Sequence, residues 1–163
     1  MADEENRSGP ADDGWALALK TWVVLARAFN AVHAHARADV ARHGLTIAEF
    51  AVLEALFHKG PLLLGEVQRK ILVSSGGITY LIDRLAARGL VERRPSSHDR
   101  RAVYAALTEQ GEALVRSIFP QHARAVQRAL AGIDDREKAE VIRLLRKLGM
   151  AATERESGDA AAD

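Results

Sequence analysis

The sequence predicts a mainly α-helical fold with one small β-hairpin, and three observations lead to this fold class. Glycine and proline residues divide the 163-residue chain at intervals that suit helices. Between these breaks the apolar residues mostly recur every three or four positions, which is the spacing of one face of an α-helix. Only in residues 90–107 does the pattern change, to two short β-compatible runs around a polar turn.

The first helix is expected to begin at Trp15 and to carry a long apolar stripe. The steps between stripe residues alternate between four and three, and its members are Trp15, Leu19, Trp22, Ala26, Phe29, His33, Ala36 and Val40. Such a stripe covers about seven turns, which is longer than a usual helix of a globular protein. We therefore expect this helix to span a large core or to pack against another chain.

The later helices are predicted from their start and end signals. Short polar side chains that can accept a hydrogen bond from the first turn are Thr46, Ser74 or Ser75, Thr108, and Asp134 or Asp135. Glu49 follows Thr46 by three residues and completes a capping box. A third helix is expected over residues 64–72, and Gly89 ends the fourth. Pro120 is expected to kink the fifth helix, because proline lacks the backbone N–H donor.

The charge is distributed unevenly along the chain. The formal net charge is +1, but residues 1–14 carry −4 and residues 154–163 carry −3, which leaves +8 on the body over residues 15–153. Both ends are rich in polar and acidic residues and are expected to be disordered tails. A basic body between acidic tails is a common layout for a chain that binds a polyanion.

The composition argues against several classes of protein. The chain has no cysteine, so disulfides, thiolate metal sites and thiol redox switches are excluded. No apolar run is long enough to cross a membrane and no secretory signal is recognisable, so a cytoplasmic protein with no membrane partner is expected. The six histidines match no metal-ligand spacing. No nucleophile elbow, phosphate loop or paired carboxylates indicate an enzyme, and we expect neither a metal nor a cofactor.

The turn between the third and fourth expected helices fits a helix-turn-helix motif, in which the second helix enters the major groove of DNA. Gly76 and Gly77 are poor helix formers, and close approach of the backbone to a phosphate is one reason to tolerate them near the start of this helix. An ordinary packed helix with a loose first turn fits the segment equally well. The turn alone therefore leaves both interpretations open.

The hairpin that follows changes this balance. Residues 93–101 carry a net charge of +3, because four arginines outnumber Asp99. Arginines on a thin hairpin can enter the narrow minor groove of DNA, although an isolated run of charges is usually only a solvated loop. Because the hairpin directly follows the helix-turn-helix candidate, the two together predict DNA binding more strongly than either does alone.

The same region carries motifs of a known family. Asp99, Arg101, Leu107 and Thr108 occupy every fixed position of the pattern D-x-R-x5-L-T. Ahead of it stand Ser74-Ser75-Gly76-Gly77-Ile78-Thr79, Ile82-Asp83-Arg84-Leu85 and Arg88-Gly89-Leu90-Val91. In these motifs the chain resembles the MarR family of bacterial transcription regulators, whose wing and recognition helix have this form.

The resemblance implies a winged helix-turn-helix protein. A DNA-binding lobe would cover residues 45–108 with a wing at 91–107, and dimerisation helices would cover residues 15–43 and 109–153. The implied function is that of a homodimeric regulator in the bacterial cytoplasm, at the nucleoid, most often a repressor. It would bind a pseudo-palindromic operator, with half-sites roughly 10 base pairs apart, and be released by a small molecule such as a phenol or an acyl compound.

The resemblance also implies which residues meet DNA. Arg100 and Arg101 would form the wing tip, with Asp99 orienting it. Arg94 would lie near the DNA backbone. Gly76 is added as a DNA contact because glycine lets the backbone approach a phosphate closely. The residues implied to face the major groove or its phosphates are Ser74, Ser75, Thr79, Tyr80 and Arg84.

An effector pocket is expected between the dimerisation helices and the DNA-binding lobe. Its candidate walls are aromatic side chains and one histidine: Trp22, Phe29, His33, Phe50, Phe57 and Phe119. On the first helix such aromatic residues are more often dimer core than ligand cage. The alternative function is a winged-helix module that binds proteins and not DNA. Salt dependence distinguishes the two, because only phosphate contacts make affinity fall steeply with salt.

Overall fold

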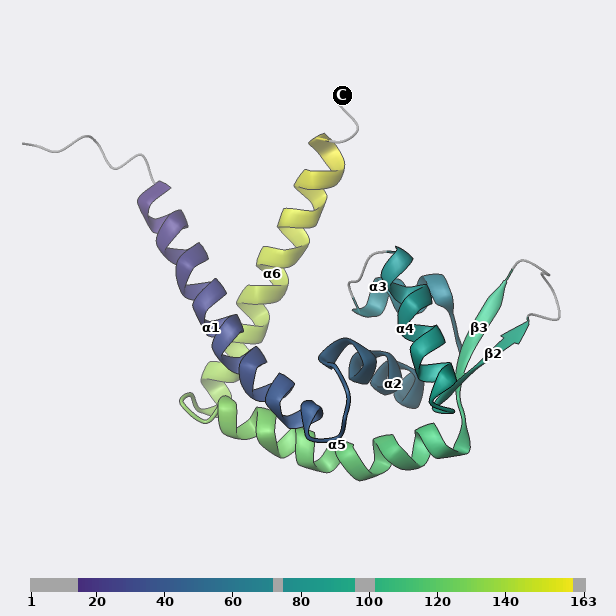
Figure 1. The fold of residues 1–163 in the computed structure, drawn as a ribbon. Helices are drawn as coiled ribbons and strands as arrows, with labels where there is room; N and C mark the ends of the chain where they lie inside the picture. Colours follow the sequence, from purple (N-terminus) through teal and green to yellow (C-terminus); the bar gives the residue numbers. More distant parts are fainter. Residues whose placement is uncertain (1–14, 72–74, 96–101, 160–163) are drawn as a thin grey trace, which may run out of the picture. The chain divides into compact units, whose positions relative to one another are not determined.

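The computed structural model describes residues 15–71, 75–95 and 102–159. Its elements, in chain order, are α1 (Trp15–Ala41), α2 (Ile47–Lys59), β1 (Leu62–Leu63), α3 (Leu64–Ile71), α4 (Ser75–Ala87), β2 (Val91–Pro95), β3 (Val103–Leu107), α5 (Glu109–Ala129) and α6 (Asp135–Asp159) (Figure 1). The expected fold class, mainly helical with a small β-hairpin, is confirmed. The chain forms two compact units, one ending at Val126 and one beginning at Gln127. Among the described residues, no helix has the length and apolar character to cross a membrane.

The core of the first unit is formed mainly by α2, α4, α5 and the sheet. Its largest fully buried apolar side chains are Phe50, Leu53, Ile82, Leu85 and Ile118. They recur at the three- and four-residue spacing that places one face of each helix inward. Each contributes about 1.5–3 kcal/mol by leaving water, so this core holds the helices that carry the functional surface.

The sheet is antiparallel, with β3 in the centre between β1 and β2. In β2 and β3, Arg93 lies opposite Ala105 and Val91 lies opposite Leu107, which confirms the predicted hairpin. Its turn, residues 96–101, lies outside the described residues. On the other side of β3, Leu62 also pairs with Ala105. The strand β1 was not expected, because a strand of two residues shows no periodicity in the sequence.

Local capping follows the sequence closely. The Glu49 N–H donates to Thr46 Oγ1 at 3.2 Å, and Thr46 N–H donates to the Glu49 carboxylate at 2.8 Å, which confirms the capping box. The Gly111 N–H donates to Thr108 Oγ1 at 3.0 Å, so Thr108 caps α5 as predicted. Gly89 follows α4 with a φ of 68°, a conformation that glycine adopts without strain.

The helix α5 contains Pro120, where the kink stays a prediction, and α6 ends later than expected. The helix α5 continues through Pro120 to Ala129, although proline inside a helix costs about 3 kcal/mol. The buried side chains of Val115 and Ile118, in the part of α5 before the proline, offset part of this cost. The helix α6 extends to Asp159, so residues 154–159 are not part of a disordered tail. Helix propagation is cooperative, and the glutamate and arginine residues that begin this stretch are good helix formers.

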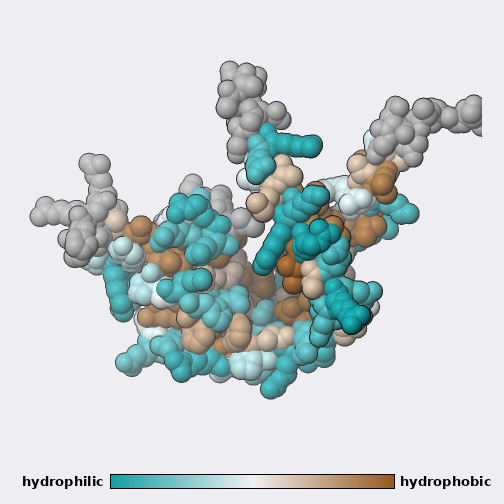
Figure 2. Space-filling model, turned by 180° about the vertical axis from the view of Figure 1, so that it is seen from behind, coloured by the Kyte–Doolittle hydropathy of each residue, from teal (hydrophilic) through white to brown (hydrophobic). Residues whose placement is uncertain are grey.

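The helix α1 leaves most of its apolar stripe exposed. Trp15, Leu19, Trp22 and Phe29 are 53–66% exposed, and only Val40 at the far end of the stripe is fully buried. Figure 2 shows brown apolar residues open at the surface of α1, next to the grey N-terminal residues. So many exposed apolar side chains on one helix mark an interaction surface, since a monomeric protein rarely leaves such a patch uncovered.

The helix α6 has a similar character in the second unit. A capping box begins it, because Asp134 accepts from the Glu137 N–H at 2.9 Å and Glu137 accepts from the Asp134 N–H at 2.8 Å. The hydrogen bonds that Arg143 donates to Glu140 hold the pKa of Glu140 below its ordinary value. The exposed apolar residues of α6 are Val141, Ile142, Leu144, Leu145, Leu148 and Met150.

Candidate nucleic-acid interface

The helix α4 has one buried and one exposed face. The buried face consists of Ile78, Leu81, Ile82 and Leu85, as the sequence predicts. The exposed face carries Thr79, Tyr80, Asp83 and Arg84. Tyr80 is 60% exposed, and the guanidinium carbon of Arg84 lies 5.6 Å from the centre of its ring. A helix that presents polar side chains and one aromatic ring to solvent suits readout of a DNA groove.

The hairpin lies beside α4 and is tied to it by an ion pair (Figure 1). Arg93 of β2 donates to the Asp83 carboxylate of α4 at 2.7 Å. Arg94, the next residue, pairs within its own strand with Glu92 at 2.6 Å. Asp83 and Glu92 both lie outside residues 93–101, the segment with a net charge of +3. The positive charge of Arg93 and Arg94 is therefore partly balanced by neighbours.

Several of the predicted DNA-contact residues lie outside the described residues. These are Ser74, Asp99, Arg100 and Arg101, together with the side chain of Ser75 and the surroundings of Gly76 at the start of α4. The others, Thr79, Tyr80, Arg84 and Arg94, are all exposed. Three of these belong to the outer face of α4 and one to β2, so the described part brings helix and hairpin residues to adjoining elements.

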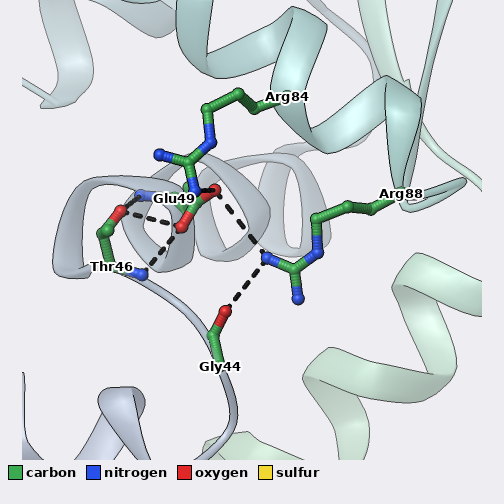
Figure 3. Close-up of polar contacts among 5 residues, drawn as sticks. All are labelled: Gly44, Thr46, Glu49, Arg84 and Arg88. Atoms are coloured by element: carbon green, nitrogen blue, oxygen red, sulfur yellow. Dashed lines mark hydrogen bonds and ion pairs between the residues drawn. The ribbon is translucent and has the colours of Figure 1, made fainter.

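A buried carboxylate behind α4 was missed as a functional group by sequence reasoning (Figure 3). Glu49 of α2 is fully buried, and its Oε1 lies 3.2 Å from Arg84 Nη2 and 3.7 Å from Arg88 Nη1. Arg88 also donates to the Gly44 carbonyl at 3.1 Å. One signal was present, since Arg84 in the last turn of α4 and Arg88 directly after it are four residues apart, the spacing that places two side chains on one side of a helix. Their acidic partner, however, is 35 or more residues away in the chain.

The residues expected to line an effector pocket are divided among separate contacts. On α1, Phe29 stacks on His33 with ring centres 5.2 Å apart, and Trp22 is 66% exposed. Phe57 and Phe119 both pack edge-on against His58, at 5.3 and 5.1 Å. The structure thus joins α2 and α5 through an aromatic cluster, while the aromatic residues of α1 remain on its exposed surface.

The last of these residues, Phe50, is part of the core and contacts a buried polar group. Its ring lies 4.6 Å from the ring of His122 on α5. His122 Nδ1 is 3.2 Å from the buried carboxylate of Asp39, which also pairs with Arg42. These contacts fasten the C-terminal end of α1 to α5. In the described part of the chain no group of three or more histidine, aspartate or glutamate side chains is arranged to hold a metal ion.

Sequence comparisons relate the chain to known regulators. Residues 43–102 match the model of the MarR family. The HTH-type transcriptional regulator MhqR of Bacillus subtilis (strain 168) is 38% identical over 134 residues, which cover 82% of this chain and 92% of that protein. The uncharacterized HTH-type transcriptional regulator YkoM of the same organism is 39% identical over 133 residues, or 82% and 86% of the two chains.

Solved structures with the same fold include complexes with DNA. BpsR of Bordetella bronchiseptica, whose DNA binding is regulated by 6-hydroxynicotinic acid, is 30% identical with a TM-score of 0.73, over 80% of this chain and 98% of that one. Sco3205 of Streptomyces coelicolor, solved with DNA, has a TM-score of 0.77 at 20% identity, over 82% and 90%. That likeness supports the fold. The extended identity to MhqR and the helix-turn-helix with its hairpin show that this chain belongs to the MarR family of DNA-binding transcription regulators.

Proposed function

We propose that this protein is a homodimeric repressor that binds a pseudo-palindromic operator and releases it when a small molecule binds. The observation that carries the DNA-binding part is the exposed face of α4 held against the hairpin by the Asp83–Arg93 ion pair. This pair couples the element suited to the major groove to the element suited to the minor groove. One DNA site would therefore be read by both at once.

In this proposal α4 enters the major groove and the hairpin acts as the wing. Thr79, Tyr80 and Arg84 contact bases or phosphates, and Arg94 lies close to the DNA backbone. The remaining proposed contacts fall outside the described residues: Ser74, Ser75 and Gly76 at the start of the helix, and Asp99, Arg100 and Arg101 at the wing tip. Arginine in the minor groove gains from the strongly negative potential of a narrow groove.

The exposed apolar surfaces of α1 and α6 support a homodimer. Each surface is made of large side chains that water would otherwise surround, and burial of each one on association is worth about 1.5–3 kcal/mol. A two-fold dimer presents two α4 helices to DNA, which matches a site with two inverted halves.

An aromatic effector is supported by two observations. The side chains Phe57, His58 and Phe119 supply ring surfaces between α2 and α5. The DNA binding of BpsR is regulated by a hydroxylated aromatic acid. The name of NicR of Pseudomonas putida, 33% identical over 64% of this chain, supports the repressor part of the proposal. We therefore propose a small phenolic or acyl compound as the effector of this protein.

The test is a wing substitution with a matched control. Arg101→Ala should abolish binding to an operator identified upstream of the gene, while the helical circular dichroism and the dimer stay unchanged. Arg136→Ala on α6, an exposed arginine outside the proposed surface, should bind as the wild type does. Unchanged operator affinity of Arg101→Ala at physiological salt contradicts the wing assignment. A wild-type affinity that hardly varies with salt contradicts DNA binding and favours a protein-interaction module.

A further inference from the structure

Glu49 is a fully buried carboxylate whose two oxygens have different partners (Figure 3). Its Oε2 accepts from the Thr46 N–H at 2.8 Å and from the Thr46 hydroxyl at 2.9 Å, which is the capping box of α2. Among the described residues its Oε1 has no hydrogen-bond donor, and its charge is balanced there by the ion pairs with Arg84 and Arg88. The capping role therefore accounts for one oxygen of this carboxylate, and the other oxygen pairs with Arg84 and Arg88.

Because Glu49 is buried, its charge has to be compensated by a partner of opposite charge. A carboxylate removed from water is strongly destabilising unless an opposite charge compensates it. Arg88, the residue directly after α4, also donates to the Gly44 carbonyl, which joins the end of α4 to the loop between α1 and α2. Arg88 therefore anchors α4 and compensates Glu49 at the same time.

Arg84 is more exposed than Arg88 and lies at the functional face. Its side chain is 44% exposed, and in the described part of the chain it has no acidic partner other than Glu49. It also lies over the ring of Tyr80 on the outer face of α4. The same guanidinium thus contacts a buried carboxylate behind α4 and an aromatic ring in front of it. A DNA phosphate at this face would compete with Glu49 for Arg84.

We propose that Glu49 is a positioning residue for DNA recognition, an inference that rests on the proposed function of α4 as the recognition helix. Glu49 fixes α4 through Arg88 and holds Arg84 back from indiscriminate contact with phosphate. DNA of unrelated sequence then gains little affinity from Arg84. The operator gains affinity from contact with the aligned surface of α4. The carboxylate behind the helix therefore raises the ratio of operator affinity to random-sequence affinity.

The variant Glu49→Gln separates this role from capping. Glutamine keeps an oxygen that can accept from the Thr46 N–H, so the capping box is preserved while the negative charge is lost. Its amide group cannot balance the arginines, and Arg84 becomes free to bind phosphate. Glu54→Gln is the matched control, because Glu54 lies on the same helix and forms no ion pair among the described residues.

The experiment measures affinity for two duplexes by fluorescence anisotropy over a range of salt concentrations. One duplex is enriched from a random library by the wild-type protein, and the other is an unselected duplex of the same length. For Glu49→Gln we expect the affinity for the unselected duplex to rise about threefold, with a salt slope steeper by about 0.9. The ratio of the two affinities should fall about tenfold. Glu54→Gln should match the wild type.

A second variant keeps the proposal testable if Glu49→Gln does not fold. Arg84→Gln should weaken binding to the enriched duplex. It should leave the salt slope for the unselected duplex unchanged, because in the wild type Glu49 already keeps the charge of Arg84 from the phosphates of that duplex. A slope that falls by about 0.9 overturns the proposal. So does a Glu49→Gln variant that matches Glu54→Gln, or one that loses both affinities equally. A wild type that enriches no duplex refutes the proposed function itself, and the wild-type measurement alone decides this.

Discussion

Substitution of Gly111 tests the junction from which the wing emerges. Gly111 lies in the first turn of α5 and is buried against Leu90, the residue that precedes β2. A Cβ at this position would overlap the Leu90 carbonyl oxygen and lie 2.9 Å from its carbonyl carbon. No side chain can rotate to relieve this clash, because both groups are backbone. Gly111→Ala therefore has to move α5 away from the start of the hairpin.

The hydrogen bonds at this junction set the size of the effect. The Thr108 N–H donates to the Leu90 carbonyl at 3.2 Å, and the Thr108 hydroxyl donates to the Gly89 carbonyl at 2.6 Å. Overpacking costs about 1–3 kcal/mol, and each weakened hydrogen bond adds about 1 kcal/mol. Alanine returns about 1 kcal/mol through its higher helix propensity. We expect Gly111→Ala to lower the free energy of unfolding by about 2–4 kcal/mol.

Gly149→Ala is the matched control. Gly149 lies inside α6, and a Cβ there meets no atom within 4 Å, so only helix propensity changes. The variant should gain about 0.5–1 kcal/mol. Both variants are compared with the wild type by thermal unfolding at one protein concentration, since the stability of a dimer depends on concentration. A Gly111→Ala protein as stable as the wild type would refute the close approach of α5 to Leu90.

Two further predictions concern the interfaces. Trp22→Glu should weaken the dimer at micromolar concentration in sedimentation equilibrium, because it places a charge in the exposed stripe of α1. Ala28→Glu, on the same helix outside the stripe, should remain dimeric. Equal behaviour of the two variants would contradict the α1 interface. Asp83→Asn should lower operator affinity several-fold by releasing the wing from α4, with a stability change below about 1 kcal/mol because the ion pair is exposed. Glu92→Gln removes the same charge from a pair within β2 alone, so equal operator affinities of these two variants would argue against anchoring by Asp83.

The sequence by itself determined the features that depend on near neighbours. The capping box of Thr46 and Glu49, the cap at Thr108 and the glycine after α4 each involve residues within a few positions of one another. The buried face of α4 follows from the helical period of its apolar residues. Hydrogen bonds and side-chain spacing of this range are set by the local backbone, so they can be read before the fold is known.

The tertiary structure alone decided the features that join distant segments. The strand β1 exists because β3 lies beside it, with 40 residues or more between the paired positions. The second role of Glu49 appears only when α2 packs behind α4, and Arg93 meets Asp83 only when the hairpin folds back along that helix. A charge in the sequence shows that a partner is needed, but the identity of the partner depends on which surfaces the hydrophobic core brings together.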